Sequence, residues 1–268
     1  MKILLNKMDL FEALKSATNL GFVPTMGSLH KGHVSLIKRS KKECTKTIVS
    51  IFVNPTQFNN NKDYKKYPRN IKKDLSILRK LKIDYVFIPD KKDIYDFKRE
   101  NEIKIMKKDK ILCAKFRKGH FEGVIDVMDR LIKIVKPKKI FMGEKDFQQL
   151  YLIKKYIGNK IKVISCKTIR DNQKLALSSR NNRLDYIGLK VARSISKNIY
   201  NLKKILKKEK KTQKILSTKK KSLDSLKNIK IEYLELRNKF TLKKTNKLKN
   251  SKIFIAYYIN DIRLIDNF

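Results

Sequence analysis

Two of the three histidines in this chain, His30 and His33, stand in the pattern His-x-Gly-His. Apolar residues 20–23 precede them, a small-residue turn containing Gly27 comes between, and an amphipathic run follows. This order predicts a strand, a loop and a helix that begins near Gly32. In such a unit the loop's backbone N–H groups and the helix N-terminus can hold phosphate oxygens, because glycines let the backbone approach closely. Imidazoles at the helix mouth can donate to the same polyphosphate.

Two further clusters contain the residue types that phosphate chemistry needs. The segment GEKD follows a short apolar strand, and there Lys145 supplies a point positive charge while Asp146 can accept from ribose hydroxyls or orient the lysine. Ser178, Ser179 and Arg180 combine two hydroxyl donors with a guanidinium that can fork onto phosphate oxygens. The sequence therefore offers three separate sets of phosphate ligands.

Polar residues also follow the buried strand expected at residues 47–53, where Asn54 and Gln57 stand in the segment NPTQF. Open α/β sheets bind ligands at the carboxyl ends of their strands, which makes both residues candidate ligands. The alternative is that they cap the strand exit and stabilise a turn. Likewise, His30 and His33 can be surface residues or helix caps, and the other two clusters can be ordinary helix starts.

Four segments resemble, in order, the motifs of the pantothenate synthetase family, which belongs to the nucleotidyltransferases with a His-x-Gly-His element. They are PTMGSLHKGHVSLI, SIFVNPTQF with a following D-x-x-x-Y-P-R, GEKDFQQL and LALSSRNNRL. The segment FRKGHFEG and the final IRLIDN resemble the family as well. Together these stretches span most of the chain.

The resemblance implies roles for individual residues. The implied catalytic residues are His33, which would donate a proton or stabilise phosphate charge, His30 and Lys145. The implied pantoate or β-alanine ligands are Gln57, Gln149 and Asn54. The implied ATP contacts are Met26, Gly27, Ser28, Leu29, His30, Lys31, Gly32, His33, Gly143, Glu144, Lys145, Asp146, Ile169, Leu177, Ser178, Ser179 and Arg180. The metal ligands are unknown.

The chain departs from the family pattern in three loops. Lys118 stands where proline is usual, which frees φ and favours a more mobile loop. His120 in that loop is a binding residue or a structural histidine that satisfies loop carbonyls. Gln173-Lys174 replaces a usual Asp-Gly, which makes a glycine-type turn doubtful. Asn260 replaces a usual glycine, and asparagine is the next-best residue where φ is positive.

Positive charge dominates the composition. The 268 residues include 67 Lys+Arg against 25 Asp+Glu, a formal net charge of +42. Such a charge attracts nucleic acid or anionic lipid non-specifically. The lysines are spread from end to end, however, and asparagine and isoleucine, which also have A/T-rich codons, are plentiful. Mutational drift is therefore the favoured explanation, and no specific nucleic-acid partner is expected.

The cysteines and the hydropathy of the sequence indicate the cellular compartment in which the protein is expected. Cys44, Cys113 and Cys166 are scattered and form no C-x-x-C, which predicts reduced thiols in a cytoplasmic protein. None of these cysteines is placed to form a covalent intermediate. No apolar run approaches the roughly 18 residues of a membrane span, and the polar residues of the first ten positions argue against a secretory signal.

The expected elements form two domains. Strands are expected at residues 2–5, 20–23, 47–53, 85–89, 139–142 and 162–169, and helices at 8–17 and 124–135 among others. A long helical region at 185–221 and alternating strands at 230–236 and 252–258 follow. The predicted fold is α/β, with a Rossmann-like parallel sheet in an ATP- and pantoate-binding domain over residues 1–175. A smaller α+β lid-like domain is expected over residues 176–268.

The resemblance implies an AMP-forming ligase that condenses pantoate with β-alanine through a pantoyl adenylate. It further implies ATP with Mg²⁺ as substrate, no prosthetic group, and a homodimer. This set of groups, with hydrogen-bond donors, a lysine, an arginine and two amides, suits in-line attack of a carboxylate on the α-phosphate. Catalysis of such a reaction depends mainly on positioning and on neutralisation of phosphate charge. Another adenylyl-transferring enzyme with His-x-Gly-His is the alternative, but it would have no reason to carry Gln57 and Gln149 in these contexts. A basic nucleic-acid-binding protein would explain the charge but not the phosphate motifs.

Overall fold

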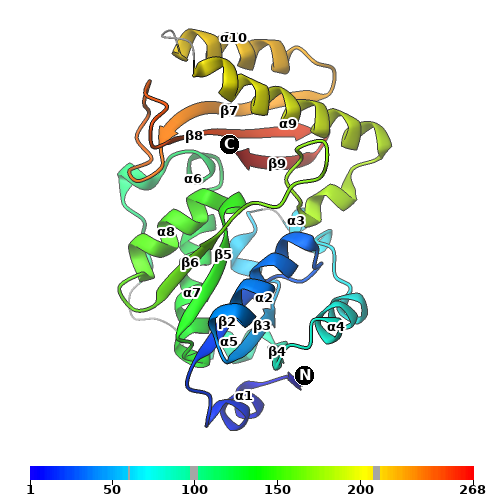
Figure 1. Cartoon of the computed structure of the whole chain (residues 1–268), viewed down its shortest axis with the longest axis vertical. Coiled ribbons are helices and arrows are strands. Elements are labelled where there is room, and N and C mark those ends of the chain that lie inside the picture. The colour runs from blue at the N-terminus through cyan, green and yellow to red at the C-terminus, as the bar shows by residue number, and fades with distance from the viewer. Residues whose placement is uncertain (60, 97–101, 208–211) are drawn as a thin grey trace. The chain divides into compact units, whose positions relative to one another are not determined.

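The computed structural model of the chain describes residues 1–59, 61–96, 102–207 and 212–268, which divide into two compact units (Figure 1). Unit 1 comprises Met1–Glu144 and Gln148–Lys167, and unit 2 comprises Lys145–Phe147 and Thr168–Phe268. A short piece of chain in the middle of the sequence thus packs with the carboxyl-terminal part. The domain boundary expected at residue 175 stays a prediction.

Within the described residues of unit 1, six strands form a parallel sheet in the order β1-β4-β3-β2-β5-β6. They are β1 (Lys2–Leu4), β2 (Leu20–Thr25), β3 (Lys46–Ile51), β4 (Tyr85–Phe87), β5 (Lys139–Gly143) and β6 (Lys162–Cys166). The Rossmann-like parallel fold expected from the sequence is confirmed. The strand order reverses between β2 and β5, and open α/β sheets bind their ligands at the carboxyl ends of strands at such a reversal.

Helices join these strands, as they must in a parallel sheet. They are α1 (Lys7–Leu14), α2 (Lys31–Glu43), α3 (Asn61–Lys65), α4 (Ile71–Lys80), α5 (Lys91–Ile94), α6 (Cys113–Phe116), α7 (His120–Val135) and α8 (Phe147–Ile157), with 3₁₀ turns η1 (Pro55–Gln57), η2 (Lys107–Asp109) and η3 (Glu144–Asp146). Leu36 and Ile37 of α2 and Leu78 of α4 pack in one apolar cluster with Val49 and Phe141 of the sheet. This cluster packs α2 against the sheet.

Two sequence expectations in unit 1 need correction. The helix expected at residues 8–17 ends at Leu14, and of its two adjacent large apolar residues Phe11 is 49 % exposed while Leu10 is fully buried. A helix of two turns buries only a narrow face against the rest of the protein, so one of these two large apolar side chains remains exposed to solvent. Strand β6 ends at Cys166 and not at residue 169, because the chain leaves unit 1 after Lys167.

Unit 2 is the smaller α+β domain expected from the sequence. Its elements are η4 (Ser179–Arg183), α9 (Tyr186–Leu206), α10 (Thr212–Asp224), β7 (Ile229–Asn238), β8 (Ser251–Ile259) and β9 (Ile262–Asn267), and the three strands form an antiparallel sheet. The helical region expected at 185–221 consists of two helices, with 208–211 outside the described residues. Ile195 and Ile199 of α9 pack with Ile253 and Ile255 of β8. Asn260 has φ of 52°, as expected for its turn.

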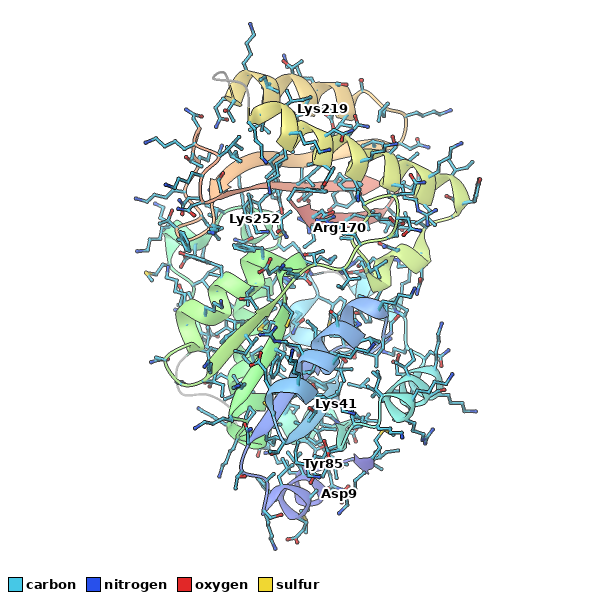
Figure 2. The ribbon with its side chains drawn as sticks, in the orientation of Figure 1. Asp9, Lys41, Tyr85, Arg170, Lys219 and Lys252 are labelled. Atoms are coloured by element: carbon cyan, nitrogen blue, oxygen red, sulfur yellow. The ribbon has the colours of Figure 1, made fainter. Side chains whose placement is uncertain are left out.

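Lysine side chains are distributed over both units. The labelled Lys41 lies on α2, Lys219 on α10 and Lys252 on β8 (Figure 2). This distribution agrees with a charge that belongs to the whole composition and not to one groove.

Candidate active site

A buried carboxylate that the sequence did not reveal ties down the loop between β2 and α2. Asp74 of α4 is 1 % exposed and accepts hydrogen bonds from the N–H groups of Ser28 (2.8 Å) and Leu29 (2.7 Å). Gly27 has φ of 76°, and a Cβ there would lie 3.0 Å from Asp74 Oδ2, so this turn requires glycine. The amides of Ser28 and Leu29 are therefore bound to an internal carboxylate, and the contact of these residues with ATP stays a prediction.

His30 and His33 cap α2 with reciprocal hydrogen bonds. Nδ1 of His30 accepts from the N–H of Gly32 (3.1 Å), and Nδ1 of His33 accepts from the N–H of His30 (3.3 Å). An accepting Nδ1 holds no proton, so the neutral rings carry their proton on Nε2. The ring centroids lie 4.1 Å apart. The helix cap that the sequence left open is thus present, and it sets the tautomer in which both Nε2–H groups can donate to phosphate.

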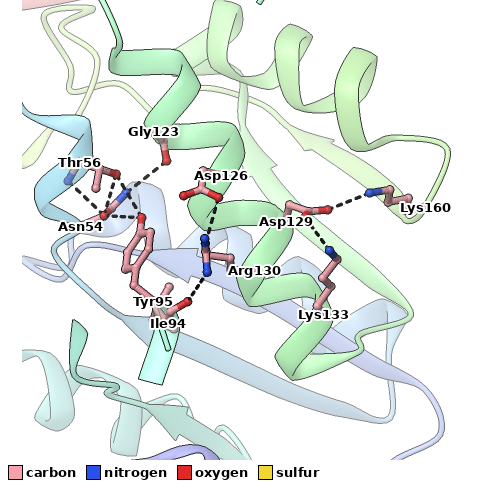
Figure 3. A network of polar contacts seen from close by, with 10 residues as sticks. All are labelled: Asn54, Thr56, Ile94, Tyr95, Gly123, Asp126, Asp129, Arg130, Lys133 and Lys160. Atoms are coloured by element: carbon pink, nitrogen blue, oxygen red, sulfur yellow. Dashed lines mark hydrogen bonds and ion pairs between the residues drawn. The ribbon is translucent and has the colours of Figure 1, made fainter. Parts of the chain in front are cut away.

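Asn54 holds the turn after β3 through a network of polar contacts (Figure 3). Its Oδ1 accepts from Thr56 N–H (3.3 Å) and from the Tyr95 hydroxyl (2.9 Å), and its Nδ2 donates to the carbonyl of Gly123 (3.3 Å). These contacts match the capping alternative, because both ends of the buried amide are used by the protein. The predicted contact of Asn54 with substrate stays untested, and these bonds do not favour it.

The same network continues through Tyr95 into α7 (Figure 3). The Arg130 guanidinium lies 4.7 Å from the centre of the Tyr95 ring and donates to Ile94 O (3.2 Å) and Asp126 Oδ1 (3.0 Å). Burial raises the pKa of the Tyr95 hydroxyl, so it remains a donor to Asn54 at neutral pH. No local pattern connects these residues with the NPTQF turn, and sequence reasoning therefore missed them.

Gln57, at the end of η1, is fixed by its backbone. Its carbonyl oxygen accepts from Nδ1–H of His120 (2.7 Å) and from the Arg117 guanidinium (3.2 Å). Arg117 also donates to Nε2 of His120 (2.8 Å), which makes that ring a donor at Nδ1 and gives His120 the structural role that the sequence left open. The Gln57 side chain is half-buried, and its amide makes no hydrogen bond within the described residues.

Gly123 is the point of closest approach between α7 and η1. A Cβ at this position would lie 2.5 Å from the carbonyl oxygen of Thr56, a backbone atom that cannot move alone. We expect Gly123→Ala to lower the free energy of unfolding by about 1–3 kcal/mol, because α7 and η1 must separate. Urea unfolding measures this loss. Gly143→Ala is the matched control, since its Cβ would meet no described atom within 4 Å. Equal stability of the two variants would contradict the close packing of Gly123.

Gln148 and Gln149 are adjacent on α8, but their side-chain amides differ in their hydrogen bonding. Gln148 is buried, and its Nε2 donates to the carbonyls of Asp109 (3.3 Å) and Ile111 (2.6 Å), which anchors the preceding segment. Gln149 is half-buried, and its amide makes no hydrogen bond within the parts of the chain that the structure describes. Of this pair, Gln149 therefore has the amide that a ligand can use, as the resemblance implies.

Lys145 lies in η3 and packs with unit 2. Its Nζ is 3.4 Å from Asp146 Oδ1, and its side chain is 19 % exposed. This contact agrees with one of the two roles that the sequence left open for Asp146, and the other role, as an acceptor for ribose hydroxyls, stays a prediction. Gly143 and Glu144, the preceding predicted ATP residues, belong to unit 1 and continue from the carboxyl end of β5.

The turn before the serine–arginine segment forms despite its altered sequence. Lys174 stands at the position of the usual glycine and has φ of 71°. This left-handed conformation costs a residue with a side chain about 1–2 kcal/mol of conformational free energy. Asp171 Oδ1 supports the turn by accepting from the N–H groups of Gln173 (2.9 Å) and Leu175 (3.0 Å). The turn that the sequence left doubtful is therefore present, and Lys174 adopts the left-handed conformation that a glycine would otherwise supply.

The predicted clamp follows this turn within unit 2. Ser178 caps η4, and its Oγ accepts from the N–H of Arg180 (3.3 Å), while Ser179 is buried and Arg180 is half-buried. Leu177 N–H donates to the carbonyl of Ile169 (3.0 Å), so these two predicted ATP residues are paired through their backbones. Met26 lies in the loop after β2, and Lys31 is the first residue of α2. The predicted ATP residues are therefore divided between the two units.

Comparison with known proteins decides the family. The sequence profile of the family described as Pantoate-beta-alanine ligase matches residues 3–268. The chain belongs to the pantoate-beta-alanine ligase family. The pantothenate synthetase of Pseudothermotoga lettingae is 40 % identical over 264 residues, which cover 95 % of this chain and 92 % of that protein. The pantothenate synthetase of Helicobacter acinonychis is 40 % identical over 275 residues, covering 100 % and 99 %.

Solved structures of pantoate-beta-alanine ligases have the same fold. A Thermus thermophilus structure matches with a TM-score of 0.93 at 30 % identity, covering 100 % of this chain and 99 % of that one. A Francisella tularensis ligase complexed with β-γ ATP and β-alanine matches with a TM-score of 0.82 at 37 % identity, covering 100 % and 97 %. The chain is accordingly a ligase, as the sequence predicts.

Three further properties concern the described part of this ligase. It contains no group of three or more His, Cys, Asp and Glu side chains placed to hold a metal ion. None of its helices combines the length and apolarity needed to cross a membrane. The cysteines are buried thiols, and burial raises the pKa of Cys44 and Cys166, so neither is a thiolate nucleophile at neutral pH.

Proposed function

We propose that this ligase condenses pantoate with β-alanine at the expense of ATP through a pantoyl adenylate. The pantoate carboxylate attacks the α-phosphorus of ATP, and pyrophosphate leaves. The amine of β-alanine then attacks the acyl carbon, AMP leaves, and the amine loses a proton. The complex of the Francisella relative with β-γ ATP and β-alanine supports both molecules as substrates here.

The site residues supply donors and positive charge for the first step. The Nε2–H groups of His33 and His30 donate to phosphate oxygens, since their Nδ1 atoms are held by the α2 cap. Lys145 neutralises charge that develops on the phosphates, and Ser178 to Arg180 clamp them. Mg²⁺ bound to the ATP substrate would supply countercharge to the pyrophosphate as it leaves. Catalysis is mainly positioning and charge neutralisation, without a covalent bond to the protein.

The half-buried amides of Gln57 and Gln149 are the observation that carries the choice of substrate. They follow β3 and β5, the two neighbours of β2, whose loop holds the histidines, and neither makes a hydrogen bond within the described residues. Because the protein uses neither side-chain amide, both stay available to a substrate that has hydroxyl and carboxylate groups. This favours a hydroxy acid such as pantoate over the substrates of other adenylyl-transferring enzymes.

Isotope exchange between pyrophosphate and ATP tests the adenylate directly. The purified protein should move labelled pyrophosphate into ATP when pantoate is present, and should need no β-alanine to do so, because adenylate formation is reversible. Exchange that depends on another acid and ignores pantoate would overturn the substrate assignment and favour a different adenylyl-transferring enzyme. Exchange that requires β-alanine would overturn the stepwise route.

We also propose that the ligase is a homodimer in the cytoplasm, as membership in the family implies. Sedimentation velocity measures the first part, and a single species with twice the mass of one 31.7 kDa chain is expected. A concentration-independent monomer would contradict it.

The high positive charge should be incidental to catalysis. Replacing exposed lysines of the 203–221 stretch, such as Lys204, Lys207 and Lys214, by glutamine should weaken binding to duplex DNA and leave pantothenate formation unchanged. Any such binding should be independent of sequence and fall steeply with salt, because it depends on counterion release. Filter binding from 50 to 300 mM salt measures this. Tight, sequence-selective binding at physiological salt would contradict the prediction, as would loss of catalysis in a folded variant.

A further inference from the structure

The last strand of unit 2 contains a buried polar pair, Asp266 and Asn267, that the proposed reaction does not use. Nδ2 of Asn267 donates to the carbonyl oxygen of Lys145 at 3.0 Å. This hydrogen bond links residues 122 positions apart in the sequence, and both of them belong to unit 2. The end of the chain therefore contacts the backbone of the proposed catalytic lysine.

Arg170 connects the same pair to the turn that precedes the clamp. Its guanidinium donates to the Asp266 carboxylate at 2.6 and 2.9 Å, and also to the carbonyls of Asn267 (2.8 Å) and Lys174 (2.9 Å). It lies 4.2 Å from the centre of the Phe268 ring. An arginine that is both bidentate and stacked is held in one orientation. Arg170 thus fixes the turn on which the clamp loop depends.

Phe147 provides a second anchor for the segment Lys145–Phe147. Its ring packs edge-on against Phe254 of β8 with centroids 5.6 Å apart, and the Lys252 ammonium lies 5.2 Å from its centre. The residues on either side of this segment, Glu144 and Gln148, belong to unit 1. Contacts within unit 2 therefore hold this segment, and Asn267 binds the backbone of Lys145 itself.

We propose that Arg170, Asp266 and Asn267 form a positioning cluster that holds Lys145 and the clamp loop in one fixed arrangement. In this proposal the three residues act through Lys145 and the clamp loop and not on the substrate. Lysine is a compact charge on a flexible stem, so the placement of its backbone decides where Nζ can reach. A displacement of about 1 Å in a catalytic group can cost about 10²-fold in rate. Burial holds the pKa of the Asp266 carboxyl above its ordinary value, although the hydrogen bonds from the Arg170 guanidinium oppose this shift.

Hydrogen exchange tests the positioning without any assumption about the reaction. In Asn267→Ala, amide exchange in the peptide that contains Lys145–Phe147 should quicken roughly tenfold, as expected for the loss of one buried hydrogen bond. Asn267→Leu, which keeps the volume, should do the same. The matched control is Arg263→Ala, because Arg263 lies in the same strand and donates to the carboxylate of Glu232 at 2.6–3.1 Å. Unchanged exchange in both Asn267 variants, or an equal rise in the control, would overturn the proposal.

A double-mutant cycle connects the cluster to catalysis and rests on the proposed function. Asn267→Ala should lower kcat about tenfold in the wild-type background but less than about twofold in the Lys145→Ala background, because it acts through that lysine. Arg263→Ala should leave kcat unchanged in both. Equal losses in the two backgrounds would show that Asn267 acts through general stability and would overturn the positioning role. A wild-type protein without ligase activity would refute the proposed function, and the exchange result would still decide the inference.

Discussion

His33→Asn lowers turnover by about 10² or more and leaves the melting temperature close to that of the wild type, because it separates the two functions of this ring. Asparagine keeps an acceptor near the position of Nδ1, where His33 accepts from the N–H of His30 at 3.3 Å. It has no donor in the place of Nε2–H. The expected result is therefore a preserved helix cap and a lost donor to phosphate.

His33→Ala should lose both functions. Its turnover should match that of His33→Asn, and its melting temperature should fall by about 2–4 °C, as expected for a lost helix cap. Lys145→Ala should lower turnover to a similar extent with little change in melting. Lys154→Ala is the matched control for lysine, since Lys154 donates to Ser165 on the surface of unit 1. Steady-state kinetics and calorimetry give both quantities. Full activity of His33→Asn would show that the ring serves only as a cap.

Gln57→Ala and Gln149→Ala should each raise the KM for pantoate about 10–100-fold and change the KM for ATP by much less. Each amide is half-buried and has no hydrogen bond within the described residues, so its loss affects the substrate more than the fold. Removal of an amide that reads a hydroxyl or carboxylate leaves that substrate group without its partner. Kinetics with one substrate varied at a time separates the two constants.

Gln148→Ala is the contrast variant for this prediction. Gln148 is adjacent to Gln149, but its Nε2 is bound to the carbonyls of Asp109 and Ile111. It should lose stability by about 1–3 kcal/mol, because one buried and one partly buried hydrogen bond lose their donor. Equal rises in the KM values for ATP and pantoate in Gln57→Ala and Gln149→Ala would mean that these residues shape the site generally.

The predictable part of this structure was set by local patterns. The buried apolar run that became β3 and the strand–loop–helix order around His30 depend on neighbouring residues, so the parallel sheet and its loops could be expected from the sequence. The left-handed residue at Asn260 was expected for the same reason. The backbone conformation of such segments depends on residues that are close in the sequence, so it can be predicted before the fold is known.

The unpredicted part depends on residues that are distant in the sequence. Asp74 binds the amides of Ser28 and Leu29 across 46 and 45 residues, and Asn267 reaches Lys145 across 122. No periodicity links such pairs. Asn54 and Gln57 stand in one motif, yet only the fold shows that the side-chain amide of Asn54 is bound by the protein while that of Gln57 makes no hydrogen bond within the described residues. A motif thus indicates candidate functional residues, and the tertiary contacts show which of them stabilise the fold and which are available to a ligand.

The most direct test of the proposed reaction is an assay of AMP and pantothenate with each substrate omitted in turn. The purified protein with ATP, Mg²⁺, pantoate and β-alanine should form AMP and pantothenate in equal amounts. Omission of either acid should reduce AMP formation to background after at most one turnover. Sustained AMP formation without pantoate, or AMP formation with no pantothenate, would contradict the proposed function.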